Sequence, residues 1–185
     1  MKDVKTIIQN KSLILSGGNR DFRMETIDKI KSSWKVIPGR SEVFVLKENI
    51  KNSDQFIKAV VKCLPVTSPL KGVKKEQMGW DQVNDYFMEW PHELKYDSAL
   101  IIIPELYSYY KDDKELFFAH LKRILYYANL YYVVGACNLK LMVTLECAIP
   151  ELESSLSANV VTIPSYLKKV NSAKSMSSLL EVLNI

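Results

Sequence analysis

The most uniformly apolar stretch of the chain lies near its middle, at residues 98–106. It contains four aliphatic residues in a row, 100–103, and ends at Pro104 and Glu105. The β-branched isoleucines favour a strand over a helix, and the run is too short to cross a membrane. A strand that is apolar at every position is buried on both faces, which is typical of parallel sheets in α/β proteins. We therefore expect it inside a parallel sheet, with its polar end at the edge where such folds place their sites.

Shorter apolar runs alternate with segments whose apolar residues recur every three or four positions. The runs predict strands, and the three-to-four spacing predicts amphipathic helices. The predicted strands cover residues 12–15, 43–46, 98–106, 139–145 and 159–163, and the predicted helices cover 20–34, 53–64, 80–90 and 112–128. Strands that alternate with helices predict a mostly parallel sheet of about five strands with helices on both faces, a three-layer α/β fold.

Length and composition are those of one globular domain. The chain has 185 residues, 48% of them hydrophobic and 25% charged, which is ordinary for a soluble protein. We expect a single α/β domain over residues 1–185, with 1–11 as an N-terminal extension and 165–185 as a C-terminal helical tail. The polar N-terminus lacks the features of a signal peptide, and no apolar run reaches the roughly 20 residues of a membrane span.

The cysteines and histidines are too few and too scattered for a metal site. Cys63, Cys137 and Cys147 lie far apart and form no C-x-x-C pair, and the chain has only two histidines. Sparse, odd-numbered cysteines indicate reduced thiols in an intracellular protein, not a disulfide framework or a zinc site. We therefore expect a cytoplasmic protein, or a nuclear one in a eukaryote, that carries no metal and no cofactor.

The net charge of +4 is distributed unevenly. Residues 1–40 carry nine Lys or Arg against four Asp or Glu, whereas residues 76–115 carry ten Asp or Glu against three Lys. A basic end and an acidic middle indicate two surfaces that bind different partners. We expect a protein partner, an oligomer or hetero-complex, nucleic acid as a candidate ligand of the basic N-terminal region, and no membrane.

A glycine pair follows the first predicted strand and precedes the first predicted helix. A strand, a Gly17-Gly18 turn and a helix N-terminus form a geometry that favours anions. The phosphate-binding motif GxxxxGK[ST], counted from Gly18, however, places Arg23, Met24 and Glu25 where glycine, lysine and Ser/Thr are needed. The pattern favours a simple tight turn, and the alternative is a vestigial phosphate site in which Arg20 or Arg23 replaces the lysine.

The middle strand resembles the Walker B strand of the RecA/AAA-type P-loop ATPases. That strand has four apolar residues, then Asp and often Glu, and this chain has the apolar run 100–103, then Pro104 and Glu105. The order of the following elements also fits, so the resemblance covers about residues 12–164. It implies a RecA-like core without a working nucleotide site, in a non-hydrolysing subunit of a recombination, replication or repair assembly. Glu105 would be catalytic only if an ATPase activity were retained.

The predicted helix at 80–90 carries a row of acids. Asp81, Asp85 and Glu89 lie one turn apart on one side, and Trp80 and Phe87 lie on the other. A solvated outer face over an aromatic inner face explains this pattern most simply, and a docking ridge for a basic partner is the alternative. The order of elements over residues 42–146 resembles the barstar family, which implies an immunity protein that inhibits a ribonuclease toxin through these acids. This is our second functional hypothesis.

Aromatic side chains gather around the predicted helix at 112–128. Exposed tyrosines could stack on single-stranded nucleic acid, although such rings are more often buried. The spacing of His120 from its apolar neighbours predicts a core histidine and not a catalytic one. The tyrosines concerned are Tyr107, Tyr109, Tyr110, Tyr126, Tyr127, Tyr131 and Tyr132.

Overall fold

The computed structural model describes residues 12–34, 39–46, 49–64, 77–93, 96–152, 156 and 159–163. The predicted N-terminal extension and C-terminal tail lie outside these ranges. The elements within the ranges are β1 (Leu13–Gly17), α2 (Arg20–Trp34), β2 (Ser41–Val45), α3 (Ser53–Cys63), α4 (Trp80–Glu93), β3 (Ser98–Ile103), α5 (Tyr107–Asp112), α6 (Lys114–Val133), β4 (Asn138–Leu145) and β5 (Asn159–Ile163).

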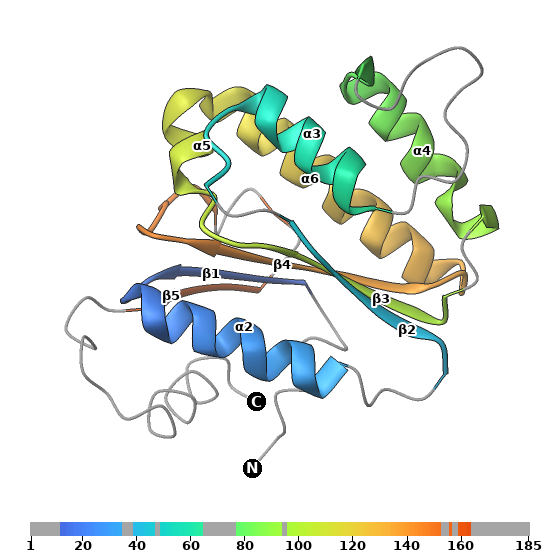
Figure 1. Ribbon diagram of the computed structural model, residues 1–185, viewed down its shortest axis with the longest axis horizontal. Coiled ribbons are helices and arrows are strands. Elements are labelled where there is room, and N and C mark those ends of the chain that lie inside the picture. The colour runs from blue at the N-terminus through green and yellow to red at the C-terminus, as the bar shows by residue number, and fades with distance from the viewer. Residues whose placement is uncertain are drawn as a thin grey trace.

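The strands form one sheet in the order β2-β3-β4-β1-β5, and each neighbouring pair is parallel. All six residues of β3 are buried, as expected for an interior strand with helices on both sides. Because the strands run in one direction, the carboxyl ends of β1, β3 and β4 meet at one edge of the sheet (Figure 1). The predicted three-layer α/β fold is confirmed.

Alternate side chains of β3 contact different helices. Leu100 and Ile102 belong to the core between the sheet and α2, where Ile30 of α2 packs with them. Ile101 and Ile103 belong to a larger core on the other face of the sheet. Figure 1 shows α2 below the sheet and α3, α4 and α6 above it. Because successive side chains of a strand point to opposite faces of its sheet, β3 contributes side chains to the cores on both faces.

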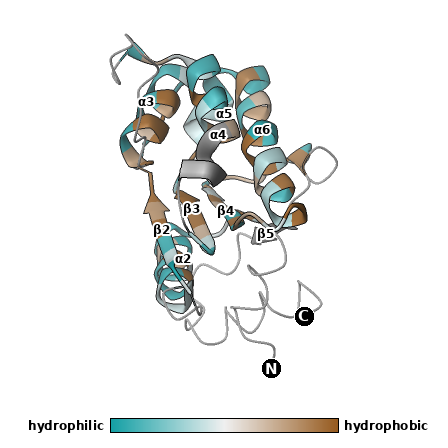
Figure 2. Cartoon of the chain, turned by 90° about the vertical axis from the view of Figure 1, so that its right-hand side faces the viewer, coloured by the Kyte–Doolittle hydropathy of each residue, from teal (hydrophilic) through white to brown (hydrophobic). Residues whose placement is uncertain are grey.

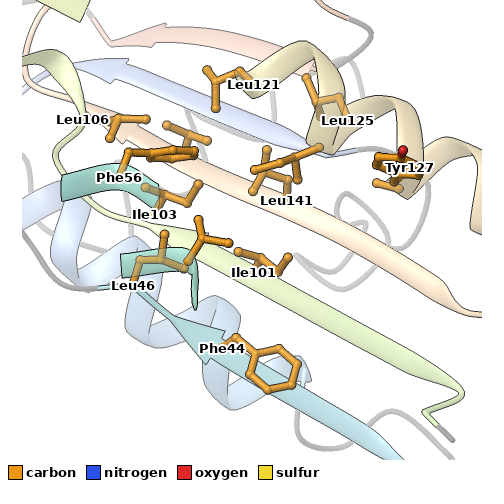
Figure 3. Close-up of a cluster of buried hydrophobic side chains, with 14 of the residues drawn as sticks. Phe44, Leu46, Phe56, Ile101, Ile103, Leu106, Leu121, Leu125, Tyr127 and Leu141 are labelled. Atoms are coloured by element: carbon orange, nitrogen blue, oxygen red, sulfur yellow. The ribbon is translucent and has the colours of Figure 1, made fainter. Parts of the chain in front are cut away.

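The larger core joins three elements that are distant in sequence. Phe56 of α3, Leu121 and Leu125 of α6, and Leu141 of β4 point into the same space between sheet and helices (Figure 3). Each of these side chains is at most 1% exposed. Burial of a leucine or phenylalanine side chain stabilises a fold by about 1.5–3 kcal/mol, so this face holds much of the stability of the domain.

Three helices begin where a polar side chain replaces a missing backbone partner. The side-chain oxygens of Asn19, Asn52 and Asp113 each accept a hydrogen bond from the backbone N–H three residues ahead, at 2.7, 2.9 and 2.9 Å. Such caps satisfy donors that the first turn of a helix leaves without a partner. They explain why α2 and α3 begin where the sequence predicts.

The predicted helix over 112–128 corresponds to α6, and a short helix that was not predicted, α5, precedes it. Asp113 has an extended backbone (φ −147°, ψ 96°), which ends the short helix α5 and caps α6. α6 then continues to Val133 because Tyr131 is still buried against the core. The predicted start of this helix at Asp112 and Asp113 is therefore correct, whereas its predicted end near Ala128 is too early.

None of the helices in the described ranges has the length and apolar character needed to cross a membrane. Cys63, Cys137 and Cys147 are free thiols in the structure.

Candidate functional site at the glycine turn

The glycine turn consists of Gly17, Gly18 and Asn19, which connect β1 to α2. Gly17 and Gly18 have φ angles of 78° and 67°, in the left-handed region that glycine adopts readily. Only Gly18 and Asn19 separate the last residue of β1 from the first residue of α2. The connection is therefore a sharp reversal and not the longer loop of a GxxxxGK[ST] motif.

Arg23 projects from the first turns of α2 back into the glycine turn. Its Nη1 atom donates hydrogen bonds to the carbonyl oxygens of Gly17 and Gly18, at 2.8 and 2.9 Å. Its Nε and Nη2 atoms donate to the two carboxylate oxygens of Glu105, at 2.7 and 2.8 Å. The side chains of Arg23 and Glu105 are only 4% and 6% exposed, so the two form a buried bidentate ion pair across the edge of the sheet.

Thr144 positions the carboxylate at this edge. Its hydroxyl accepts a hydrogen bond from the backbone N–H of Glu105 at 2.9 Å and donates one to Oε1 of the same residue at 3.1 Å. Glu105 itself has a φ of 54°, which costs a residue with a side chain on the order of 1–3 kcal/mol and persists only where surrounding contacts fix it. The contacts from Thr144 and Arg23 provide that support.

This arrangement leaves little capacity to bind a phosphate. Four of the five N–H donors of the Arg23 guanidinium are used by the carboxylate and the two glycine carbonyls. The N–H of Phe22, which could face an anion at the start of α2, is already bonded to the Asn19 side chain. Arg20 is exposed at the first residue of α2 and does not take part in the buried pair. The Arg23 guanidinium and the Phe22 N–H are therefore already engaged by groups of the chain itself.

A metal ion has no evident place at the end of β3. Pro104, which is buried, stands where the resemblance to the RecA/AAA-type ATPases would place an aspartate. Among the described residues, no group of three or more His, Cys, Asp or Glu could hold a metal ion. The carboxylate of Glu105 is occupied by Arg23, so it cannot activate a water molecule without breaking that pair.

The acidic row on α4 lies on the outside of the helix layer. Asp81 is exposed and Asp85 is half-buried, whereas the side chain of Glu89 lies outside the described residues. Trp80 and Phe87 face inward and pack with the larger core. The predicted division between an acidic outer side and an aromatic inner side therefore agrees with the structure over its described part.

His120 and the neighbouring tyrosines serve mainly as core. The His120 ring stacks on Trp80 with centroids 3.9 Å apart, and its Nδ1 atom shares a 2.7 Å hydrogen bond with the hydroxyl of Tyr109. Burial lowers the pKa of His120 to about 4, so the ring is neutral near pH 7. Tyr109, Tyr127 and Tyr131 are buried, which excludes them from stacking on nucleic acid, whereas Tyr126 and Tyr132 are exposed.

Comparison with known proteins shows a match in fold and none in sequence. No protein-family model and no curated protein matches the chain. The Aeropyrum pernix ORC2 protein in its ADPNP–ADP complexes has a similar structure, with a TM-score of 0.52 at 12% identity over 85% of this chain and 42% of that one. The ADP form of the ORC2 protein gives 0.48 at 10% identity over 93% and 47%. A chain of Drosophila ORC bound to DNA gives 0.46 at 10% identity over 96% and 28%.

The similarity to the nucleotide-bound ORC2 protein agrees with the predicted three-layer α/β fold. At this low identity it shows the fold alone. This chain spans less than half the length of that protein.

The sequence did not predict the connection between Arg23 and Glu105. Both residues were candidates, but Arg23 was considered as a vestigial phosphate ligand, the alternative to a simple tight turn, and Glu105 as a catalytic residue only if an ATPase activity were retained. They are 82 positions apart, and no local pattern links them. The one available signal was topological, because both residues follow the carboxyl end of a predicted parallel strand and so lie at the same edge. Thr144, which completes the network, was not singled out.

Proposed function

We propose that this chain is a non-hydrolysing RecA-like subunit of a nucleic-acid-processing assembly that acts in recombination, replication or repair. In this proposal the fold serves as a scaffold for contacts with other macromolecules and not as an ATPase. The single observation that carries the proposal is the buried ion pair between Arg23 and Glu105, which fills the glycine turn.

The ion pair supports a non-hydrolysing role by removing both groups that ATP chemistry would use. A nucleotide would have to displace Glu105 from the Arg23 guanidinium, and the freed carboxylate would then repel the phosphates. Phosphoryl transfer also needs a metal ion to neutralise the charge that develops on the phosphates. The buried Pro104 supplies no ligand for such an ion.

The fold and the charge distribution support a role in an assembly. The Aeropyrum pernix ORC2 protein, whose fold is similar, binds ADPNP and ADP, and we propose that this chain retains the scaffold of such a protein but not its ligand. The basic excess over residues 1–40 is suited to phosphate backbones, whose binding releases counterions and therefore weakens with salt. Arg20 and Arg40, both exposed, contribute to this excess from the described part of the chain.

The test combines three measurements on the full chain. Isothermal titration with magnesium and ATP should show no binding in the micromolar range, and a phosphate-release assay should show no turnover. Fluorescence anisotropy with a single-stranded and a duplex oligonucleotide should show binding that weakens as salt is raised. Micromolar affinity for ATP would overturn the non-hydrolysing role, and the absence of any nucleic-acid binding at low salt, alone and with co-purified partners, would overturn the assembly role.

A second candidate is supported by the outer face of α4. Asp81 and Asp85 lie one helical turn apart, on the side of the helix away from the core, and could enter the cationic site of a ribonuclease toxin. The double variant Asp81→Ala, Asp85→Ala should then abolish protection of cells from a toxin encoded beside this chain. Asp112→Ala, at an exposed acid on α5, is the matched control. Full protection by the double variant would reject this candidate.

A further inference from the structure

A groove lies where the carboxyl end of β2 meets α3. Its volume is about 680 Å³, within the range of roughly 300–1,000 Å³ that is common for binding sites. Figure 2 shows β2 at one side of the sheet with α3 above its end. We call this feature the β2–α3 groove, and its lining includes the apolar residues Val45, Ile50 and Ala59 and the lysines Lys51, Lys58 and Lys62.

The charged residues of the β2–α3 groove all have the same sign. Its three lysines are exposed, and no Asp or Glu is among the described residues that line the groove. Lys58 and Lys62 lie one helical turn apart on α3, where like charges repel each other. Lys58 also contacts Asp54 at 2.7 Å, but the two side chains are 62% and 70% exposed, and a pair in water contributes little free energy. The groove is therefore suited to a partner that brings negative charge.

The backbone of β2 directs hydrogen-bonding groups away from β3 at the groove. Leu46 donates its N–H to the carbonyl oxygen of Ile102 in β3 at 2.9 Å, and successive residues of a strand direct these groups to opposite sides. The backbone groups of Val43 and Val45 therefore point outward, where no described strand pairs with β2. The N–H of Val43 is bonded to the Glu42 side chain at 3.2 Å, whereas Val45 lies at the groove and is 41% exposed. An extended peptide can pair with such an edge.

We propose that the β2–α3 groove binds an extended, acidic segment of a partner protein, which pairs with the outer edge of β2. Side chains on one face of a strand recur every two residues. A segment with acids on either side of an apolar residue can therefore set that residue against the apolar lining and its carboxylates near the lysines. None of Arg23, Glu105 and Thr144 lines this groove, so its role does not depend on whether the glycine turn binds a nucleotide.

A protein segment suits the β2–α3 groove better than a nucleic acid does. No aromatic residue is among the described residues that line it, so the groove lacks the rings on which the bases of a single strand stack. A phosphate backbone would meet the lysines but leave the apolar lining in water. An extended peptide covers that lining and also uses the outward backbone of Val45. Charge, apolar lining and strand edge therefore favour the same occupant.

The first test measures binding of the synthetic peptide Thr-Glu-Thr-Val-Thr-Glu-Thr, labelled with a neutral fluorophore, to the full chain by fluorescence anisotropy. The expected dissociation constant is on the order of 100 µM or lower. Lys51→Glu with Lys58→Glu should raise it at least about tenfold, because attraction across the interface becomes repulsion. The control, Lys111→Glu with Lys122→Glu, changes the net charge equally at exposed lysines outside the groove and should leave binding intact. A peptide that does not bind at ~1 mM, or that both double variants weaken equally, would overturn the proposal.

The same variants distinguish a peptide site from a nucleic-acid site. A single-stranded oligonucleotide should not displace the labelled peptide, and Lys51→Glu with Lys58→Glu should leave its affinity close to that of the control variant. An oligonucleotide that displaces the peptide, or whose binding only the groove variant abolishes, would assign the groove to nucleic acid and contradict the proposal.

The second test measures whether the peptide adds to β2 as a strand. Val45→Pro removes an N–H that points away from β3, so the sheet should keep its circular dichroism spectrum while peptide binding weakens at least about tenfold. Methylation of the backbone nitrogens of the peptide removes its own donors without any change to the protein, and it keeps the test valid if Val45→Pro does not fold. Equal binding of the methylated and unmethylated peptides would contradict strand addition.

Discussion

The glycine turn and the β2–α3 groove differ in how far their side chains are buried and bonded within the chain. At the glycine turn, Arg23 and Glu105 are 3% and 5% exposed and bind each other and the adjoining backbone. In the β2–α3 groove, three lysines remain in contact with water, and Val45 is 41% exposed. A site whose polar groups are paired internally has little left for a ligand, whereas an apolar surface with exposed lysines is stabilised when an acidic partner covers it. This difference is the basis of our proposal that the chain meets other molecules through surfaces other than the glycine turn, where its fold usually carries chemistry.

The largest expected effect is loss of one partner in the buried ion pair. Glu105→Ala should destabilise the domain by about 3–5 kcal/mol, because it leaves the Arg23 guanidinium buried without its counter-charge. Urea denaturation followed by circular dichroism measures the change. The matched double variant Arg23→Met, Glu105→Leu replaces both charges by apolar groups, and it should recover most of the loss. If Glu105→Ala proves as stable as the parent chain, the pair does not hold the glycine turn closed.

The inner side of α6 carries His120, a buried titratable residue, so we expect the stability of the domain to depend on pH. Burial lowers its pKa to about 4 in the folded chain, below the value of about 6.5 for an unfolded histidine. The unfolded chain therefore binds the proton more readily, so stability is full above pH 6.5 and falls as the pH is lowered towards 4. The expected loss between pH 7 and pH 5 is about 2 kcal/mol.

Thermal or urea denaturation across this pH range measures the effect, and His120→Phe is the control. Phenylalanine can retain the stacking on Trp80 but cannot be protonated, so most of the decline between pH 7 and pH 5 should disappear. An unchanged decline in this variant would assign the pH dependence to other groups.

Variants of the β2–α3 groove should distinguish an effect on peptide binding from an effect on the stability of the domain. Lys51→Glu should change the stability by less than about 0.5 kcal/mol, because Lys51 is exposed and away from the core. The same substitution at Phe56, which is buried, should unfold the domain. Denaturation midpoints distinguish the two, and a large destabilisation by Lys51→Glu would show that this lysine has a partner within the fold.

The smallest expected effect concerns the acidic row on α4. Asp81 and Asp85 are like charges at i and i+4, which cost a few tenths of a kcal/mol in a helix. Asp81 lies in the first turn of α4, where the helix dipole favours a carboxylate, so Asp85 is the residue to replace. Asp85→Asn should therefore stabilise the domain slightly, and less so at high salt. A clear destabilisation would indicate that the Asp85 carboxylate has a partner within the fold and is not available to another protein.

Local patterns predicted most of the fold. The uniform burial of β3 and the start of α3 followed from short stretches of sequence, because strand burial and helix capping depend on neighbouring residues. The short helix α5 and the extension of α6 to Val133 did not, because they depend on where a helix still finds a core to pack against.

Four residues of the glycine-turn network were candidates in the sequence, but Thr144 was not, and the contacts among them were not predicted. The sequence indicated that Gly17, Gly18, Arg23 and Glu105 lie near the same edge of the sheet. It could not indicate that Arg23 points back at Glu105, since the contact joins residues 82 positions apart and depends on the sharp reversal at the two glycines.

The most direct test of the central claim is the resonance of the Arg23 side chain. In a nitrogen–proton spectrum of labelled protein, the Nε–H of Arg23, assigned by its absence in Arg23→Lys, should exchange slowly with water because it is buried and bonded to Glu105. We predict that it keeps its position when magnesium and ATP are added to millimolar concentration. A shift or loss of this signal that saturates with added ATP would contradict the account, because it would mean that a nucleotide opens the ion pair.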